Sequence, residues 1–178
     1  MNRSLGEEAH ATTRGGEHVL IRPARGEDKA LYADFLRDVS TEDLRLRFFA
    51  RVGELSSEEL LKFEHLDAHE MLFVALDENT GRMLGLVRLK DELDEQTAEF
   101  AILVRSSLKG HGLGWLLMQR VIDYAKEKRL RRVYGDVLAD NTTMLQMCAE
   151  LGFHAHDMWS GMKRVVLELP PVRAGERR

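Results

Sequence analysis

Cysteine and long apolar runs are scarce in this chain, and each scarcity excludes a class of protein. The 178 residues include one cysteine, Cys148, which rules out an intrachain disulfide and a metal site built from several cysteines. No run approaches the ~20 apolar residues that a membrane span requires, and no apolar signal-peptide region lies near the N-terminus. We therefore expect a cytoplasmic protein without a membrane partner.

An excess of positive charge is also missing. Lysine and arginine number 26 against 30 aspartate and glutamate residues, which gives a formal net charge of −4. Nucleic-acid binding depends on basic patches that neutralise phosphates, so we expect no nucleic-acid partner. We interpret the acidic stretch at residues 91–95 as a solvated hairpin turn rather than as a docking site for a basic partner.

Metal-binding patterns are missing as well. His65 and His69 are four residues apart, and His154 and His156 share one face if their segment is a strand. Neither pair comes with the third ligand that metal sites usually need. We expect polar or packing histidines and no metal cofactor.

What the chain does have is the composition of one soluble domain. Its hydrophobic fraction of 44% is ordinary for a globular protein of this length. Residues 1–16 and 170–178 are polar and aperiodic, so we expect two flexible tails. The sequence therefore predicts a single domain over residues 17–169.

The most informative segment is a set of three alternating glycines between an apolar run and an amphipathic helix pattern. The apolar run is Phe100–Val104, and the glycines are Gly110, Gly112 and Gly114. Glycines let a backbone approach a ligand closely, and the free N–H groups at the start of a helix attract an anion. The spacing is neither that of a P-loop nor that of a dinucleotide-binding turn. The segment is typical of a loop that holds a phosphate group.

Periodicity indicates a mixture of strands and helices around this loop. Apolar and β-branched runs predict strands at residues 19–24, 71–76, 83–89, 97–104 and 133–138. Helical spacing predicts helices at residues 28–39, from 113 onward and at 141–151, with two short helices after the capping boxes Ser40–Asp43 and Ser56–Glu59. The three consecutive strands before the loop predict an antiparallel meander, and the whole order predicts the α+β class.

Two signatures resemble one known family. Lys109–Gly114 resembles the pyrophosphate-binding loop of the GNAT superfamily of acyl-CoA-dependent N-acyltransferases, with lysine in place of the usual arginine or glutamine. Asn141–Met144, followed by Glu150–Phe153, resembles the N-x-x-A…L-G-F signature that closes the cofactor site in GNAT enzymes. Leu44–Phe49, with His65–Asp67, is similar to bacterial protein lysine acetyltransferases that modify acyl-CoA synthetases. The resemblance covers most of the chain.

The resemblance implies a GNAT fold: a mixed, mostly antiparallel sheet of about seven strands with helices on both faces and two strands that splay apart to form an acyl-CoA cleft. It also implies acetyl-CoA as co-substrate, with the pyrophosphate on the glycine loop and the pantetheine arm along the preceding strand. A backbone N–H of that strand would polarise the thioester carbonyl. The implied cofactor-binding residues are Ile102, Leu103, Val104, Lys109, Gly110, His111, Gly112, Leu113, Gly114 and Asn141.

Glu99 is the candidate catalytic base. An acceptor amine is protonated in water, so its attack on a thioester requires a group that takes the proton. Glu99 shares a strand face with Ala101 and Leu103, and the resemblance implies a catalytic glutamate at this strand position. The alternative, from the residues alone, is an exposed glutamate on an alternating strand. Asp67 and Glu70 are secondary candidates for orienting the amine, with solvation at a helix end as their alternative.

One position departs from the family pattern. Many GNAT enzymes have a tyrosine seven residues after the signature asparagine, where it can protonate the departing thiolate, and this chain has Cys148 there. We therefore assign no general acid. We interpret Cys148 as a small packed residue on an apolar helix face.

Three functions are compatible with these residues. The first is transfer of an acetyl group from acetyl-CoA to a protein lysine, for example on an acyl-CoA synthetase. The second keeps the chemistry but uses a small amine, such as a polyamine, an amino acid or an aminoglycoside. The third is a module that senses acyl-CoA without transferring anything; the missing tyrosine supports it and Glu99 opposes it. The oligomeric state and the acyl-chain preference stay open.

Overall fold

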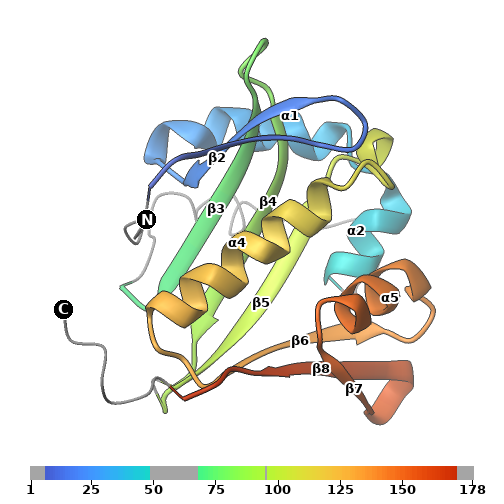
Figure 1. Ribbon diagram of the computed structural model, residues 1–178. Coiled ribbons are helices and arrows are strands. Elements are labelled where there is room, and N and C mark those ends of the chain that lie inside the picture. The colour runs from blue at the N-terminus through green and yellow to red at the C-terminus, as the bar shows by residue number, and fades with distance from the viewer. Residues whose placement is uncertain (1–6, 49–67, 95, 172–178) are drawn as a thin grey trace, which may run out of the picture.

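The computed structural model describes residues 7–48, 68–94 and 96–171. Within these ranges the chain forms one eight-stranded sheet that carries helices on both faces (Figure 1). The strands lie in the order β1-β2-β3-β4-β5-β6-β8-β7, and every neighbouring pair is antiparallel except β5 with β6. The predicted α+β class is confirmed, with eight strands where about seven were expected.

The sheet and its helices have well-defined bounds. The strands are β1 (Ala9–Thr12), β2 (His18–Pro23), β3 (Glu70–Asp77), β4 (Met83–Asp91), β5 (Thr97–Val104), β6 (Arg132–Leu138), β7 (His154–Asp157) and β8 (Met162–Glu168). The helices are α1 (Lys29–Arg37), α2 (Thr41–Phe48), α4 (Leu113–Glu127) and α5 (Thr142–Glu150), with 3-10 turns η1 (Gly26–Asp28), η2 (Ser106–Leu108) and η3 (Trp159–Gly161). The predicted meander is β3, β4 and β5, which pair in that order. No helix in the described ranges is both long enough and apolar enough to cross a membrane.

Two apolar cores lie on opposite faces of the sheet. On one face α4 covers β4 and β5 (Figure 1), and Leu117, Val121 and Val87 are fully buried together. On the other face α1 and α2 pack on the sheet, where Phe35 and Val74 are fully buried. Because the central strands are covered on both sides, their sequences read as nearly continuous apolar runs.

The parallel pair β5 and β6 separates after three residues. Residues 97–99 pair with residues 132–134, and within the described chain no ladder joins the two strands beyond that point. The separation starts at Gly135, where an added Cβ would lie 2.5 Å from the ring of Phe100, so only glycine lets that ring pack over the backbone. Residues 100–104 of β5 are therefore paired with β4 alone, and the expected splay is present.

The folded domain begins earlier than the boundary expected at residue 17. Ala9–Thr12 lies in the segment expected to be a flexible tail, yet it forms β1 and pairs with residues 18–21 of β2. Strand β1 is held in place by this pairing and by the packing of Ala9 and Ala11 against the core. A four-residue segment of alternating small and polar residues carries too weak a pattern to predict such a strand. The remaining parts of the expected tails, residues 1–6 and 172–178, lie outside the described ranges.

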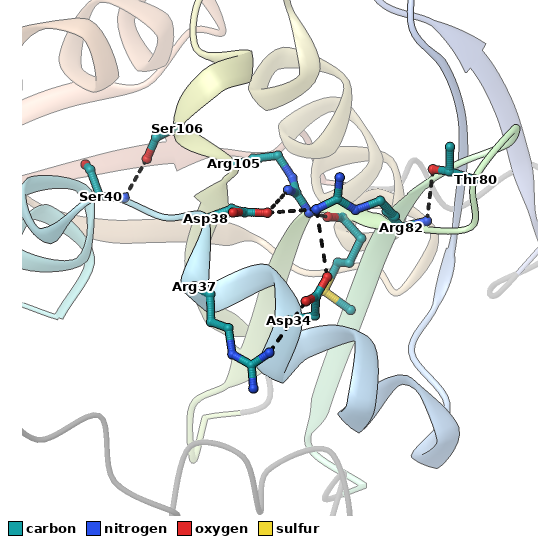
Figure 2. Close-up of polar contacts among 9 residues, drawn as sticks. Asp34, Arg37, Asp38, Ser40, Thr80, Arg82, Arg105 and Ser106 are labelled. Carbon is teal, nitrogen blue, oxygen red and sulfur yellow. Dashed lines mark hydrogen bonds and ion pairs between the residues drawn. The ribbon is translucent and has the colours of Figure 1, made fainter.

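The first predicted capping box lies at the start of α2 and includes a third residue. The Asp43 N–H donates to Ser40 Oγ at 3.1 Å, as expected of a capped helix. The Ser40 N–H donates to Ser106 Oγ at 2.7 Å (Figure 2), and Ser106 in turn donates to Asp43 Oδ2 at 2.5 Å. The cap thereby connects α2 to the segment that leads into the glycine loop. The second box, Ser56–Glu59, lies outside the described residues.

Candidate active site

A cavity of about 460 Å³ lies at the split between β5 and β6. Its lining comes from residues 99–104 of β5, Arg88 of β4, Asp136 and Val137 of β6, the glycine loop, α2, α5 and the β1–β2 turn. All the predicted cofactor-binding residues line it except His111 and Leu113, and Glu99 lines the same cavity. The structure therefore brings most of the predicted site residues together around one space.

The glycine loop at one end of this cavity has the backbone geometry of an anion site. Gly110 and Gly112 have φ angles of 80° and 90°, in the left-handed region that favours glycine. Gly112 is the N-cap of α4, and no side chain caps this helix. The first-turn N–H groups of α4 are therefore available to a ligand. Leu113 is fully buried, so its contribution to a ligand is limited to its backbone.

His111 bonds the N-terminal hairpin instead of lining the cavity. Its Nδ1 lies 2.7 Å from Glu17 Oε1, and its carbonyl accepts the Gly15 N–H at 3.3 Å. Hydrogen bonds from Thr13 and His111 lower the pKa of Glu17, so this carboxylate is ionised at neutral pH. These contacts fasten the β1–β2 hairpin to the glycine loop.

The hairpin carries a cation that the sequence analysis missed. Arg14, in the β1–β2 turn, lines the cavity, and its Nε would lie 3.3 Å from a Cβ added to Gly112. Within the described residues Arg14 has no carboxylate partner. The local signal, an arginine followed by Gly15 and Gly16, indicates a turn but not the surface on which the turn packs. Arg47 of α2 also lines the cavity, which a helical sequence pattern does not reveal because the cavity wall forms only when α2 packs on the sheet.

Lys109, the basic residue of the predicted motif, is already paired. Its Nζ forms an ion pair with Asp43 of α2, whose side chain is 7% exposed. Burial alone would raise the pKa of Asp43, but hydrogen bonds from Lys109, Ser106 and Ser40 lower it overall. The carboxylate of Asp43 partly neutralises Lys109, so Arg14 is an important cation at this end of the cavity.

A cluster of ion pairs braces the junction between β5 and the glycine loop (Figure 2). Arg105, directly after β5, is buried and pairs with Asp38 at the end of α1, and its Nη2 donates to the Met83 carbonyl at 2.8 Å. Asp38 also accepts from Arg82 at 2.9 Å, and Arg82 lies 3.9 Å from Asp34. These contacts connect α1, the β3–β4 turn and the end of β5, so they fix the direction in which the loop leaves the sheet.

Glu99 lies where the split begins, at the other end of the unpaired stretch of β5. Its side chain is 33% exposed, and its Oε2 is 3.9 Å from Arg88 Nη2. Its partner on β6 is Tyr134, whose hydroxyl donates to Glu92. Burial, this hydrogen bond and the charge of Glu99 raise the pKa of Tyr134, so the phenol stays protonated at neutral pH. Glu99 is therefore a partly exposed carboxylate at the edge of the cavity.

Asn141 lies on the opposite wall, at the start of α5. Its Oδ1 accepts the Met144 N–H at 3.2 Å and caps the helix, and the residue lines the cavity. The preceding Asp140 accepts from Arg45 of α2 at 2.9 Å. This contact joins α2 and α5, two of the helices that line the cavity.

Cys148, at the position of the family's tyrosine, is fully buried in the core beneath α4. Burial raises the pKa of its thiol to about 12, so it stays protonated and out of reach of a ligand. The prediction of a packed small residue is confirmed.

The remaining candidates are divided between described and undescribed parts of the chain. Asp67 and His65 lie outside the described residues. Glu70 begins β3, its side chain is 12% exposed, and its Oε1 is 3.8 Å from both Arg88 Nη1 and Lys90 Nζ. Among the residues that the structure describes, no group of three or more His, Cys, Asp or Glu is placed to hold a metal ion.

A mixed sheet split between two parallel strands, with a glycine loop at one end of the split, is the arrangement of the GNAT fold. The model of the acetyltransferase (GNAT) family matches residues 35–153. The chain belongs to the GNAT acetyltransferase family, and it is an acetyl-CoA-dependent N-acetyltransferase.

Individual relatives agree with this assignment. Acetyltransferase PA5475 from Pseudomonas aeruginosa is 33% identical over 141 residues, which cover 78% of this chain and 76% of that protein. The GNAT domain of PAT from S. lividans superimposes with a TM-score of 0.83 at 26% identity, covering 91% of this chain and 97% of the other. Spermidine N-acetyltransferase from Vibrio cholerae, solved with CoA and spermine, has a TM-score of 0.68 at 22% identity and covers 84% of this chain and 95% of its own. At 22% identity, this comparison shows a shared fold and nothing more specific.

Proposed function

We propose that the protein transfers the acetyl group of acetyl-CoA to the side-chain amine of a protein lysine, with Glu99 as the general base. One observation carries most of the argument: Glu99 and the glycine loop lie at the two ends of a single strand segment that has no partner on its β6 side among the described residues. A donor bound along this segment would place its anionic part at the loop and its reactive end toward the carboxylate.

Acetyl-CoA fits the described residues at three points. Its pyrophosphate would accept hydrogen bonds from the free N–H groups of the loop and of the first turn of α4. The side chains of Lys109 and Arg14 would lie near the same phosphates. Its pantetheine arm would bind the unpaired backbone of residues 102–104 as an added strand does. Asn141 would face the arm from the opposite wall.

The transfer then needs one proton acceptor and one oxyanion donor. The Glu99 carboxylate takes a proton from the lysine ammonium, and the freed nitrogen attacks the thioester carbonyl carbon. A carbon–nitrogen bond forms, the carbon–sulfur bond breaks, and the electron pair leaves on sulfur. The nitrogen then loses its second proton to water, which gives the neutral amide. A backbone N–H of residues 102–104 stabilises the charge that develops on the carbonyl oxygen. Because an ordinary thiol has a pKa of about 8.5, the thiolate is a tolerable leaving group, and we assign no general acid.

A second hollow beside Glu99 supports a protein acceptor. It measures about 700 Å³, and Tyr134, the strand partner of Glu99, forms part of its lining together with Glu92, Arg164 and His156. Such a surface has room for residues that flank a target lysine. The resemblance of Leu44–Phe49 to protein lysine acetyltransferases supports the same acceptor.

Labelled acetyl-CoA tests the acceptor class directly. The purified protein is incubated with a protein lysate in one arm and with a panel of polyamines, amino acids and aminoglycosides in the other. We expect label on lysines of particular proteins, identified by mass spectrometry and absent with Glu99→Gln. Label on small amines alone would reassign the acceptor. Tight binding of acetyl-CoA with no transfer in either arm would instead support an acyl-CoA sensor.

A further inference from the structure

Trp115 is a large aromatic side chain that belongs to neither apolar core. It lies in the first turn of α4, directly after Gly114, and it is half-buried. Among the described residues, neither the buried members of the two cores nor the partly buried side chains packed on them include Trp115. It lines the cavity beside the glycine loop instead. The packing of the domain therefore does not account for this tryptophan.

The indole of Trp115 also has no polar or ring partner within the described chain. No hydrogen bond from its Nε1–H, no aromatic pair and no cation over its ring joins it to a described residue. An indole offers an extended face for stacking and one N–H donor. In Trp115 both are left for a bound molecule.

The geometry of α4 directs Trp115 to the outer rim of the cavity. An α-helix turns by about 100° per residue, so three successive side chains point in different directions. Leu113 is fully buried in the core, and a Cβ added to Gly114 would lie 3.5 Å from Met147 of α5. Trp115 is about 200° around the helix from Leu113, on the side away from the core. The indole therefore lines the cavity where the glycine loop meets the surface.

The order of groups in acetyl-CoA decides which part of the donor would reach this rim. The acetyl group, the pantetheine arm, the pyrophosphate and the adenosine follow one another along the molecule. With the arm along residues 102–104 and the pyrophosphate on the loop, the adenosine would extend past the loop, away from the unpaired segment of β5. The adenosine is also the part of the donor for which the loop, the strand and Asn141 provide no contact.

We infer that Trp115 binds the adenine ring of acetyl-CoA by stacking, which gives the nucleoside end of the donor a subsite of its own at the rim of the cavity. The inference rests on the donor placement in the proposed function, and it does not depend on Glu99 or on the acceptor. A purine has a broad π face, and stacking of a base on an aromatic side chain contributes directly to affinity. Trp115 thereby fixes the end of the donor opposite to the acetyl group.

Tryptophan fluorescence tests the inference without relying on catalysis. The chain has two tryptophans, and Trp159 is 91% exposed in η3 and lines neither hollow. Trp159→Phe therefore leaves the fluorescence of Trp115 to be followed alone. We expect acetyl-CoA and adenosine diphosphate to quench it, because both present a purine to the indole. Acetyl-phosphopantetheine and inorganic pyrophosphate, which lack the purine, should bind without quenching.

The matched fluorescence control is Trp115→Phe, in which Trp159 is the fluorophore. Trp159 lies outside the cavity lining, so acetyl-CoA should leave its fluorescence unchanged. A similar loss of signal in both variants would show absorption of light by the nucleotide rather than stacking on Trp115, and would overturn the inference.

Calorimetric titration of Trp115→Ala measures what the ring contributes to affinity. We expect the Kd of acetyl-CoA to rise about tenfold, within the range for stacking of a base on an aromatic side chain. The Kd of acetyl-phosphopantetheine should not change. Trp115→Phe keeps an aromatic ring and should retain most of the affinity for acetyl-CoA. Trp159→Ala removes an exposed tryptophan away from the cavity and should leave both Kd values unaffected.

Two further results would overturn the inference: equal quenching of Trp115 by acetyl-CoA and acetyl-phosphopantetheine, or an equal rise of both Kd values in Trp115→Ala. Binding of acetyl-CoA without any quenching would do the same. If Trp115→Ala does not fold, the titrations of Trp159→Phe still decide, because that variant keeps Trp115. Failure of the proposed function is a separate outcome: Glu99→Gln would retain full acetyl transfer while acetyl-CoA still quenched Trp115.

Discussion

At the scale of single residues, the pairing register of β5 with β6 places Glu99 at the mouth of the split. It is the last residue of β5 that pairs with β6, so its side chain stands where the two strands separate. The alternation of β5 was enough to predict the face on which Glu99 lies, because side chains of a strand alternate strictly. The sequence could not show that Arg88 lies 3.9 Å from Glu99, since Arg88 comes from another strand.

Replacing Glu99 tests its role as base. We expect Glu99→Gln to lower kcat by about 10²- to 10⁴-fold, the usual contribution of a general base, with little change in the Kd of acetyl-CoA. Steady-state kinetics and calorimetric titration measure the two quantities. Glu127→Gln, which removes an exposed glutamate at the end of α4 that lines neither hollow, serves as the matched control and should retain activity. An equal loss in both variants would show a general effect of charge rather than a base.

Arg14 tests which residues hold the phosphates. We expect Arg14→Ala to raise the KM for acetyl-CoA about tenfold, the low end of what a charge-assisted hydrogen bond contributes. The KM for acetyl-pantetheine, which lacks the phosphates, should not change. Arg25→Ala removes an exposed arginine paired with Glu8 and should leave both values unaffected. Equal effects of Arg14→Ala on the two donors would show that Arg14 does not contact phosphate.

At the scale of secondary-structure elements, length and periodicity decided what could be predicted. Helix α4 has a full amphipathic pattern, and β3, β4 and β5 are apolar runs, so all four were predicted from the sequence. Strand β1 is four residues long and half exposed, and the prediction missed it because its order depends on pairing with β2. Strand β8 was missed as well, because its seven residues are mostly only partly buried.

The turn into α4 gives a prediction about glycine. Gly112 has a φ of 90° and Arg14 Nε would lie 3.3 Å from an added Cβ, whereas Gly26 has open space around it. We expect Gly112→Ala to lower the free energy of unfolding by about 1–3 kcal/mol and to weaken acetyl-CoA binding, because a Cβ strains this backbone. Gly26→Ala should be nearly neutral. Urea unfolding and calorimetric titration measure both effects, and a neutral Gly112→Ala would show that the loop tolerates another conformation.

At the scale of the whole molecule, a buried ion pair connects β2, the second strand of the sheet, to the start of α1. Arg22 of β2 and Asp28 form two hydrogen bonds of 2.8 and 2.7 Å, with side chains 6% and 1% exposed. Burial alone would raise the pKa of Asp28, but hydrogen bonds from Arg22 and from the Arg25 N–H lower it overall. A carboxylate with a lowered pKa contributes stability above its unfolded pKa, and that stability is lost as the pH falls through the folded value.

Asp28→Asn therefore has two expected consequences. At pH 7 the free energy of unfolding should fall by about 3–5 kcal/mol, because the Arg22 charge is left buried and unpaired. Below about pH 4, where an unfolded aspartate begins to protonate, the wild type should lose stability more steeply than the variant. Urea unfolding at pH 7, 5 and 3 measures both. Parallel pH dependences would mean that Asp28 does not control acid stability.

The sequence by itself determined the glycine loop, the strand before it and the helix after it, because backbone conformation and amphipathic periodicity are local properties. It also determined which face of β5 carries Glu99. The tertiary structure alone decided where β5 and β6 separate, because that depends on the ring of Phe100 packing over Gly135 of another strand. It likewise decided that Lys109 pairs with Asp43 while Arg14 reaches the loop, since contacts between distant segments arise only when the chain packs.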